Sequence, residues 1–258
     1  MSTSIHVTLG EVAATLVLVG LAVAVSSWRK ADLEKDIGIA VVRSAIQLTA
    51  IGYVIKFIFD QDSLWFVFLL IGIMVVFGAF TAQQRAKLVP HAFWPLLVAL
   101  AIAGATTLGL VVALGIFKAQ PRYLVPVGGM VIGNAMTAAA VTLNRLGEDM
   151  TDHAREVEAT LALGATSTQA AAPIVRRSLR SGMITLVDST KTTGIVFFPG
   201  AMTGMLVAGA DPLDAVRLQL ILLWSLLGSV SLSALIATGL GYRGFFTPAH
   251  QLRDAGPR

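Results

Sequence analysis

A small set of polar side chains within otherwise apolar sequence carries most of the chemistry open to this 258-residue chain. Asp188 and Lys191 are three residues apart, a spacing at which a carboxylate and an ammonium group can pair on one face of a helix. The sequence predicts this pair at the start of an apolar stretch, where it would stabilise the turn into that stretch. A relay of protons or cations through Asp188 is the alternative interpretation.

A second polar pair, Arg43 and Gln47, lies one helical turn apart within the apolar stretch 37–59. A charged side chain inside a bilayer costs on the order of a few kcal/mol, so residues of this kind often have a function. Either the pair lines a polar path, or Arg43 extends back to the lipid headgroups while Gln47 bonds to a neighbouring helix. The sequence leaves both interpretations open.

Amide and thioether groups form a third set, with Asn134 and Met136 in one apolar stretch and Met202 and Met205 in a later one. If these side chains face each other, they could pass a soft-to-intermediate metal ion without any thiolate. Methionine in an apolar helix more often fills gaps in the packing. The chain has no cysteine and its four histidines are far apart, so neither a disulfide nor a zinc site is expected, and the metal ligands are unknown.

Seven apolar stretches must position these side chains, and each is near or above the roughly 20 residues that a helix needs to cross a bilayer. They are Val12–Trp28, Ile37–Phe59, Ser63–Gln84, Leu88–Phe117, Tyr123–Asn144, Thr192–Ala210 and Leu218–Tyr242. A hydrophobic content of 55%, a charged content of 13% and a mean hydropathy of +0.77 are far from globular averages. The sequence predicts an all-α polytopic membrane protein, with about seven transmembrane helices in one domain over residues 1–258.

The basic residues predict the orientation of these helices in the membrane. Seven crossings with the N-terminus outside leave only Lys118, Arg122 and Arg217 on the outer side. Fourteen basic residues then lie on the inner side: Arg29, Lys30, Lys35, Arg85, Lys87, Arg145, Arg155, Arg176, Arg177, Arg180, Lys191, Arg243, Arg253 and Arg258. Because cytoplasmic loops are enriched in Lys and Arg, we expect an outer N-terminus and a cytoplasmic C-terminus. The pI of 9.7 then reflects topology rather than nucleic-acid binding.

A single long polar insert, about residues 146–191, separates the fifth and sixth stretches. Its first part, Glu148–Leu163, has the periodicity of an amphipathic helix with acidic residues in the first turn. Gly164 is placed to end this helix in the left-handed conformation, and Thr166 with Gln169 forms a capping box that starts the next helix. The sequence predicts a helix–Gly–helix hairpin on the cytoplasmic face, which is either an ordinary surface hairpin or a docking site.

The chain contains no nucleotide-hydrolysing motif. Lys191-Thr192 lacks the preceding glycine loop of a phosphate-binding motif, and Gly239-x-Gly241-x-x-Gly244 ends an apolar stretch instead of following a strand. We therefore expect no cofactor and no enzymatic activity. Energy for transport would come from a separate subunit or from an ion gradient.

Within the insert, Glu158-Ala159-Thr160-x-x-x-Gly164 is similar to the coupling loop of ABC-transporter permeases, with Thr160 in place of an alanine. The segment Ile174–Arg177 departs from the pattern usual in importers. A wider resemblance is carried by seven segments: Leu33–Ile37, Arg43–Leu48, Gly129–Met136, Leu163–Thr166, Val187–Gly194, Pro199–Gly204 and His250–Leu252. Through them the chain resembles, over nearly its whole length, the FetB (YbbM-like) permease family.

The resemblance implies the permease of an ABC exporter for iron or another metal ion or chelate, in a family that includes plant permeases linked to aluminium tolerance. It implies a cytosolic ATP-binding-cassette subunit as partner, a homodimer of permeases and a location in the cell (inner) membrane. The expected coupling residues are Glu158, Ala159, Gly164, Ala165 and Thr166. The expected translocation path contains Arg43, Gln47, Asn134, Met136, Asp188, Met202 and Met205. The alternatives are a gradient-driven secondary transporter and an ABC permease for a non-metal substrate such as a nucleotide sugar.

Overall fold

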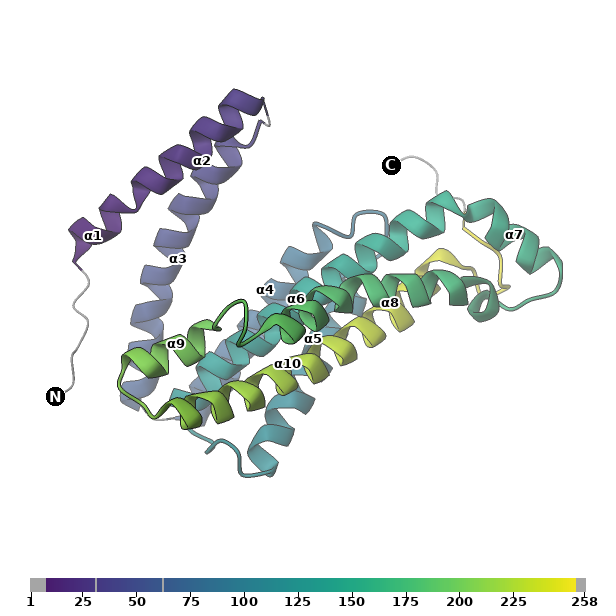
Figure 1. Ribbon diagram of the computed structural model, residues 1–258. Helices are drawn as coiled ribbons and strands as arrows, with labels where there is room; N and C mark the ends of the chain where they lie inside the picture. Colours follow the sequence, from purple (N-terminus) through teal and green to yellow (C-terminus); the bar gives the residue numbers. More distant parts are fainter. Residues whose placement is uncertain (1–7, 31, 62, 254–258) are drawn as a thin grey trace. The chain divides into compact units, whose positions relative to one another are not determined.

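The computed structural model describes residues 8–30, 32–61 and 63–253, and these residues are almost entirely helical (Figure 1). The helices are α1 (Leu9–Ala14), α2 (Leu16–Arg29), α3 (Glu34–Gln61), α4 (Leu64–Gln83), α5 (Phe93–Ala113), α6 (Pro121–Asp152), α7 (Ala154–Ala162), α8 (Ser167–Thr192), α9 (Gly200–Val207), α10 (Pro212–Gly241) and the 3-10 helix η1 (Tyr242–Phe245). Within those residues, β pairing is limited to two isolated bridges. The prediction of an all-α polytopic protein is confirmed. Arg258, counted among the inner basic residues, lies outside the described residues.

The chain divides into two compact units, residues 1–62 with 207–209 and residues 63–206 with 210–258. In the first unit, α2 and α3 form a helical hairpin. The Ser26 hydroxyl closes its turn, because it donates to Glu34 Oε1 at 2.9 Å and accepts from the Leu33 amide at 3.1 Å. The two helices are almost wholly exposed, as apolar helices that face lipid would be.

The second unit is a bundle in which α6, α8 and α10 lie side by side and α4 and α5 pack against α6 (Figure 1). Fully buried alanines, among them Ala79, Ala99, Ala135 and Ala237, let the helix backbones approach closely. The closest approach is at Gly182 of α8, where a Cβ would overlap Thr142 Oγ1 and lie 2.8 Å from the Ala138 carbonyl oxygen of α6. Only glycine permits this crossing, which fixes α8 on α6.

Six of the helices in the described residues are long and apolar enough to cross a membrane. They are Gly10–Arg29, Glu34–Gln61, Leu64–Gln83, Phe93–Ala113, Pro121–Asp152 and Pro212–Phe245. Each overlaps one of the predicted stretches. The remaining prediction, a continuous helix over 192–210, is wrong.

The chain over 192–210 consists of the last residue of α8, a non-helical segment at 193–199, the eight-residue helix α9 and a turn at 208–210. Gly194 has a left-handed φ of +85°, and Pro199 has no backbone donor. The hydroxyl groups of Thr190, Thr192 and Thr193 bond back to carbonyls of the preceding turn, which weakens the helix at this point. Hydrophobicity alone did not reveal this break.

The insert also differs from its prediction. Helix α6 is continuous from Pro121 to Asp152, so Glu148 and Asp149 lie at the end of that helix and not in the first turn of a new one. Its 32 residues are about 48 Å long, well beyond the roughly 30 Å of a bilayer core. The excess carries the α7–α8 connection away from the apolar bundle. We call this the hairpin end of the unit, and the end with Pro121 and Pro212 the opposite end.

Candidate functional site: a projecting helical hairpin

The hairpin consists of α7, the turn at Leu163–Thr166 and the first turns of α8. Gly164 adopts a φ of +89°, and its amide donates to the Leu161 carbonyl at 2.9 Å while the Ala165 amide donates to that of Thr160 at 3.3 Å. These bonds satisfy the carbonyls at the end of α7, as a left-handed glycine cap does. The predicted glycine stop is confirmed.

The next helix begins at the predicted capping box. Thr166 Oγ1 accepts from the Gln169 amide at 3.3 Å, and Gln169 Oε1 accepts from the Thr166 amide at 2.9 Å. Helix α8 then continues through Pro173 without ending. The local chemistry of the turn is therefore encoded within a few residues of sequence.

The tip of the hairpin presents an apolar side chain to its surroundings. Leu163 is 89% exposed, and Glu158, Ala159 and Gly164 are exposed beside it. Val157, on the other face of α7, is buried in the core. One face of α7 therefore holds the hairpin to the bundle while the tip stays open to a partner.

A C-terminal hook, residues 246–253, folds back against the hairpin. His250 Nδ1 lies 3.0 Å from Ser167 Oγ, and Tyr242 Oη lies 3.0 Å from Thr168 Oγ1. The hook is closed by the bridge between Phe246 and Leu252. Together with α7 it borders a hollow of about 400 Å³, lined by Glu158, Leu161, Ala162, Ala165 and residues 249–252. The support of the turn by residues 249–252 has no signal in the local sequence.

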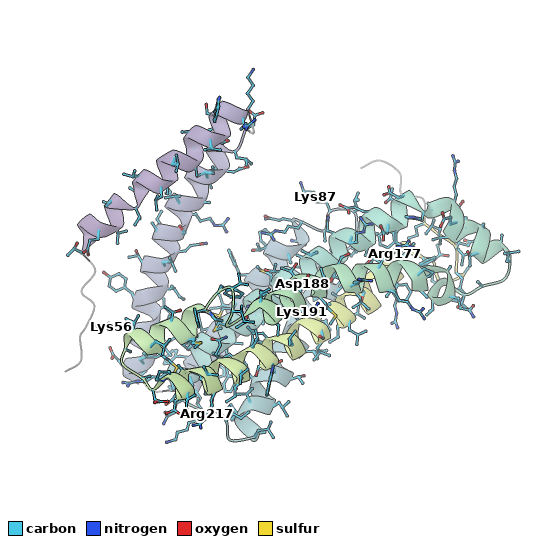
Figure 2. All side chains as sticks on the ribbon, in the orientation of Figure 1. Lys56, Lys87, Arg177, Asp188, Lys191 and Arg217 are labelled. Atoms are coloured by element: carbon cyan, nitrogen blue, oxygen red, sulfur yellow. The ribbon has the colours of Figure 1, made fainter. Side chains whose placement is uncertain are left out.

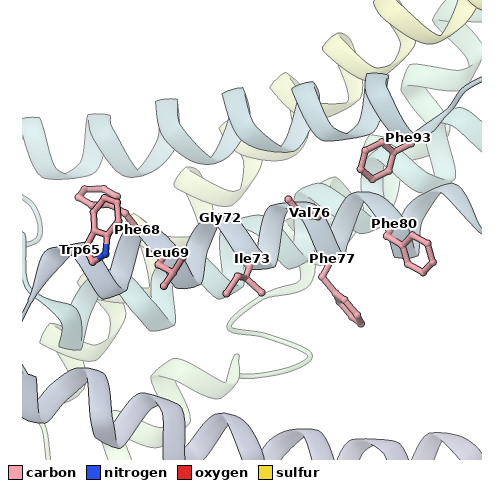
Figure 3. Close-up of a pocket in the computed structure, with 9 residues that line it drawn as sticks. All are labelled: Trp65, Phe68, Leu69, Gly72, Ile73, Val76, Phe77, Phe80 and Phe93. Atoms are coloured by element: carbon pink, nitrogen blue, oxygen red, sulfur yellow. The ribbon is translucent and has the colours of Figure 1, made fainter.

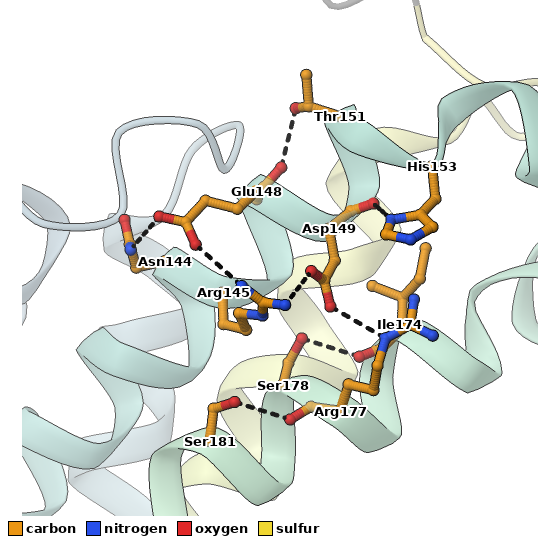
Figure 4. A network of polar contacts seen from close by, with 11 residues as sticks. Asn144, Arg145, Glu148, Asp149, Thr151, His153, Ile174, Arg177, Ser178 and Ser181 are labelled. Atoms are coloured by element: carbon orange, nitrogen blue, oxygen red, sulfur yellow. Dashed lines mark hydrogen bonds and ion pairs between the residues drawn. The ribbon is translucent and has the colours of Figure 1, made fainter.

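A buried carboxylate ties the hairpin to the long helix (Figure 4). Asp149 of α6 is 1% exposed, and it accepts from Arg145 Nη2 at 3.0 Å and from Arg177 Nε of α8 at 3.2 Å. The negative charge lies near the C-terminal end of α6, where the helix dipole disfavours it, and the two cations offset that cost. The four-residue spacing of Arg145 and Asp149 was a signal for their ion pair. The contact between Asp149 and Arg177 was not predicted from the sequence.

The predicted path residues lie on four helices. In the first unit, Arg43 and Gln47 of α3 line one shallow groove with Gly38, Ile39, Val42 and Ile46, so they share a helix face as predicted. In the second unit, Asn134 and Met136 lie on α6, Asp188 lies on α8, and Met202 and Met205 lie on α9.

The side chains of the amide and thioether set contact different parts of the second unit. Asn134 Nδ2 donates to the Met130 carbonyl of its own helix at 2.8 Å. Met136 packs against the core near Gly78 of α4, while α9 packs through Ala201 against a separate core cluster. Among the described residues, no group of three or more His, Asp or Glu side chains is placed to hold a metal ion.

Asp188 and Lys191 form the predicted pair, with Lys191 Nζ 3.1 Å from Asp188 Oδ1 and both side chains exposed. The pair lies in the last turns of α8, before the non-helical segment 193–199, and not at the start of a continuous spanning helix. Figure 2 shows both side chains on the second half of α8, between Arg177 toward the hairpin end and Arg217 toward the opposite end. Leu186, two residues before Asp188, packs against a core cluster formed by α5, α6 and α10.

A further open surface is wholly apolar. One face of α4 and Phe93 of α5 border a shallow hollow of about 690 Å³, lined by Trp65, Phe68, Leu69, Gly72, Ile73, Val76, Phe77, Phe80 and Phe93 (Figure 3). Aromatic and aliphatic side chains of this kind suit lipid chains or an apolar helix. This hollow offers no group that would hold a polar substrate.

The apolar bundle and its projecting polar hairpin define a multi-pass helical membrane protein. The sequence profile described as "Uncharacterised protein family (UPF0014)" matches residues 9–246, and the chain belongs to this family.

Three relatives are similar over nearly the whole chain. The chain is 42% identical to "UPF0014 membrane protein STAR2" of Oryza sativa subsp. japonica, over 96% of this chain and 86% of the rice protein. It is 39% identical to "Protein ALUMINUM SENSITIVE 3" of Arabidopsis thaliana, over 93% and 88%. It is 37% identical to "Probable iron export permease protein FetB" of Escherichia coli (strain K12), over 96% and 95%. No solved structure matches the chain significantly.

Proposed function

We propose that this protein is the membrane-spanning permease subunit of an ABC transporter that exports iron, another metal ion or a metal chelate. A separate cytosolic ATP-binding subunit drives it and docks on the hairpin through Glu158, Ala159, Gly164, Ala165 and Thr166. The substrate class is supported by the name of the Escherichia coli relative, a probable iron export permease.

The observation that carries the proposal is the construction of the hairpin. Its tip, with Leu163 89% exposed, can enter a groove on a partner. Its base is joined to the spanning helix α6 through Asp149 and Arg177, so a displacement of the tip reaches the bundle through a charged contact. A surface loop that transmits no movement to the bundle would need neither the exposed apolar tip nor the charged contact at the base.

Orientation and assembly complete the proposal. The excess of basic residues supports a cytoplasmic hairpin in the inner membrane, with the N-terminus outside. A homodimer of permeases encloses the path. Glycines of α6 and α9 are available for close packing in it, because a Cβ at Gly133, Gly200 or Gly204 meets no atom of another part of the chain within 4 Å. Arg43, Gln47, Asn134, Met136, Asp188, Met202 and Met205 are the proposed path residues.

The first prediction tests docking at the hairpin with Gly164→Val. A β-branched side chain at a φ of +89° strains the turn by about 1–2 kcal/mol, and the added methyl groups occupy the tip. We expect at least a tenfold loss of the ATP-binding subunit when the tagged permease is purified from membranes, at matched permease amounts.

Gly115→Val is the matched control. Gly115 also has a positive φ, of +69°, and a Cβ there also meets no atom within 4 Å, but it lies in the loop between α5 and α6 at the opposite end. Equal co-purification of the partner by the two variants would contradict docking at the hairpin. Transport by the permease without any ATP-binding subunit would instead support the gradient-driven alternative.

A further inference from the structure

The depth of Asp188 within the bundle follows from the contacts of α8. Gly182 crosses α6 at Thr142, which is close to the hairpin end of the apolar stretch 123–144. Asp188 follows Gly182 by six residues, about 9 Å along the helix. This places the carboxylate about 12 Å inside a bilayer core that is about 30 Å thick.

A second core cluster also places this part of α8 beside the spanning helices. It consists of Leu108, Val127, Val131, Leu222 and Leu226 from α5, α6 and α10. Leu186 of α8 packs against this cluster, which lies in the halves of three spanning helices toward the opposite end. The part of α8 that carries Asp188 and Lys191 therefore runs beside the spanning helices.

A charged pair at this depth is incompatible with a lipid-facing position. The side chain of Asp188 is 58% exposed and that of Lys191 is 67% exposed. Ionised groups at membrane depth face a water-filled cavity or protein and not hydrocarbon. The exposed face of this part of α8 therefore borders water or protein and not lipid chains, and Thr185 and Thr192 lie on it at three- and four-residue steps from Asp188.

The chain just beyond this face is the break between α8 and α9. Irregular backbone at membrane depth is tolerated where it is buried in protein or lines a water-filled cavity, and not where it contacts lipid. Many transporters bind their ions at such interrupted helices, where a helix C-terminal end presents carbonyl oxygens and a partial negative charge. Here the C-terminal end of α8 at Thr192 and the carboxylate of Asp188 are one turn apart.

We propose that Asp188, together with the hydroxyl groups of Thr185 and Thr192 and the C-terminal end of α8, binds a hard divalent or trivalent cation during transport. These groups are all oxygen ligands, which such cations prefer over the thioethers of the methionine set. The inference rests on the proposed function and names the point in the path where its substrate binds.

Lys191 holds this site when no cation is bound. Its ammonium group lies 3.1 Å from Asp188 Oδ1 and neutralises the carboxylate. An arriving cation displaces the ammonium group, which moves away on its flexible side chain, and the ammonium group returns when the cation leaves. A single carboxylate for which Lys191 competes with the cation binds that cation weakly enough to release it, as a transport site requires.

The test measures binding of Mn²⁺ by electron paramagnetic resonance to the full-length permease, purified with its ATP-binding subunit in lipid nanodiscs. We expect saturable binding by the wild-type protein, at least tenfold weaker binding by Asp188→Asn and severalfold tighter binding by Lys191→Met. The gain in Lys191→Met cannot come from misfolding. Asp214→Asn is the matched control, because Asp214 and Arg217 form a pair of the same spacing, 2.9 Å apart, near the start of α10, and it should bind as the wild type does.

Absence of saturable binding by the wild type would overturn the proposal, as would unchanged binding by Asp188→Asn. Unchanged or weaker binding by Lys191→Met would overturn the exchange with lysine. Co-purification of the ATP-binding subunit is recorded in the same preparations. Loss of that subunit from the wild type would count against the proposed function alone, because Mn²⁺ binding by the permease is read separately.

Discussion

Two carboxylates paired with basic side chains show how differently one kind of contact is used in this molecule. Asp149 is 1% exposed and joins α6 to α8 through Arg177, with Arg145 of its own helix as a second partner, whereas Asp188 is 58% exposed and pairs with one lysine on its own helix. A buried carboxylate between two helices has no water to replace a lost partner, so it fixes their relative position. An exposed carboxylate can exchange its partner at little cost. The contrast separates a structural contact at the hairpin end from an exchangeable one beside the spanning helices.

The largest effect is expected from Gly182→Val, because Gly182 holds α8 against α6 between the two carboxylates. The new side chain would overlap Thr142 and approach the Ala138 carbonyl, so α8 must shift. The surroundings of Asp149 and of Asp188 then change together. Overpacking of this kind costs about 3 kcal/mol or more when backbone is in the way. Thermal unfolding in detergent measures the loss. Gly228→Val on α10, where a Cβ meets no atom within 4 Å, is the control, and equal unfolding temperatures would show that the crossing is not tight.

An intermediate effect is expected from Asp149→Ala, which tests the buried side of the comparison. The variant leaves Arg145 and Arg177 without their shared partner. The loss should be about 2–3 kcal/mol, below the usual cost of breaking a buried pair because both arginines are about half exposed and water screens them. Denaturation midpoints provide the measurement. Glu148→Ala, next to it on α6 but 42% exposed, should lose much less, and similar losses in the two variants would refute a special role for Asp149.

The smallest effect is expected from Asp188→Asn, which tests the exposed side. If water reaches this face of α8, the unpaired Lys191 stays hydrated and the free energy of unfolding changes by less than about 0.5 kcal/mol. If the face instead contacted lipid, an uncompensated ammonium group would destabilise the protein far more. The unfolding midpoint of this variant thus reports the surroundings of the pair independently of cation binding. A loss as large as that of Asp149→Ala would remove the distinction between the two carboxylates.

Much of the fold follows from composition and local pattern. Six of the seven predicted stretches contain helices long enough to cross a membrane, because a run of apolar residues of that length has few stable alternatives in any environment. The turn at Gly164 and the capping box at Thr166 also match the prediction. Their hydrogen bonds join residues at most five apart, so the sequence contains all the partners.

The candidate site was predictable only in part. The hairpin was identified, but the helix predicted over 148–163 is instead the end of α6 followed by α7, with a break at His153. Glu148 and Asp149 suggested a helix start, because acidic side chains are favoured in the first turn of a helix. In the structure they lie at a helix end, where the cations that stabilise Asp149 include Arg177, which is 28 residues away in the sequence. The support from His250 is 83 residues from Ser167 along the chain and has no local signal.

The sequence by itself determined that this protein is helical and membrane-spanning, and where its hairpin turns, since these properties depend on the hydrophobicity of each stretch and on bonds between near neighbours. The tertiary structure decided that Asp149 is buried, that Asp188 is exposed on a helix packed against the spanning helices and that the chain breaks between α8 and α9. The physical reason is the close crossing at Gly182 and Thr142. It sets how far α8 runs along α6, and with it the depth and the surroundings of every charge that α8 carries.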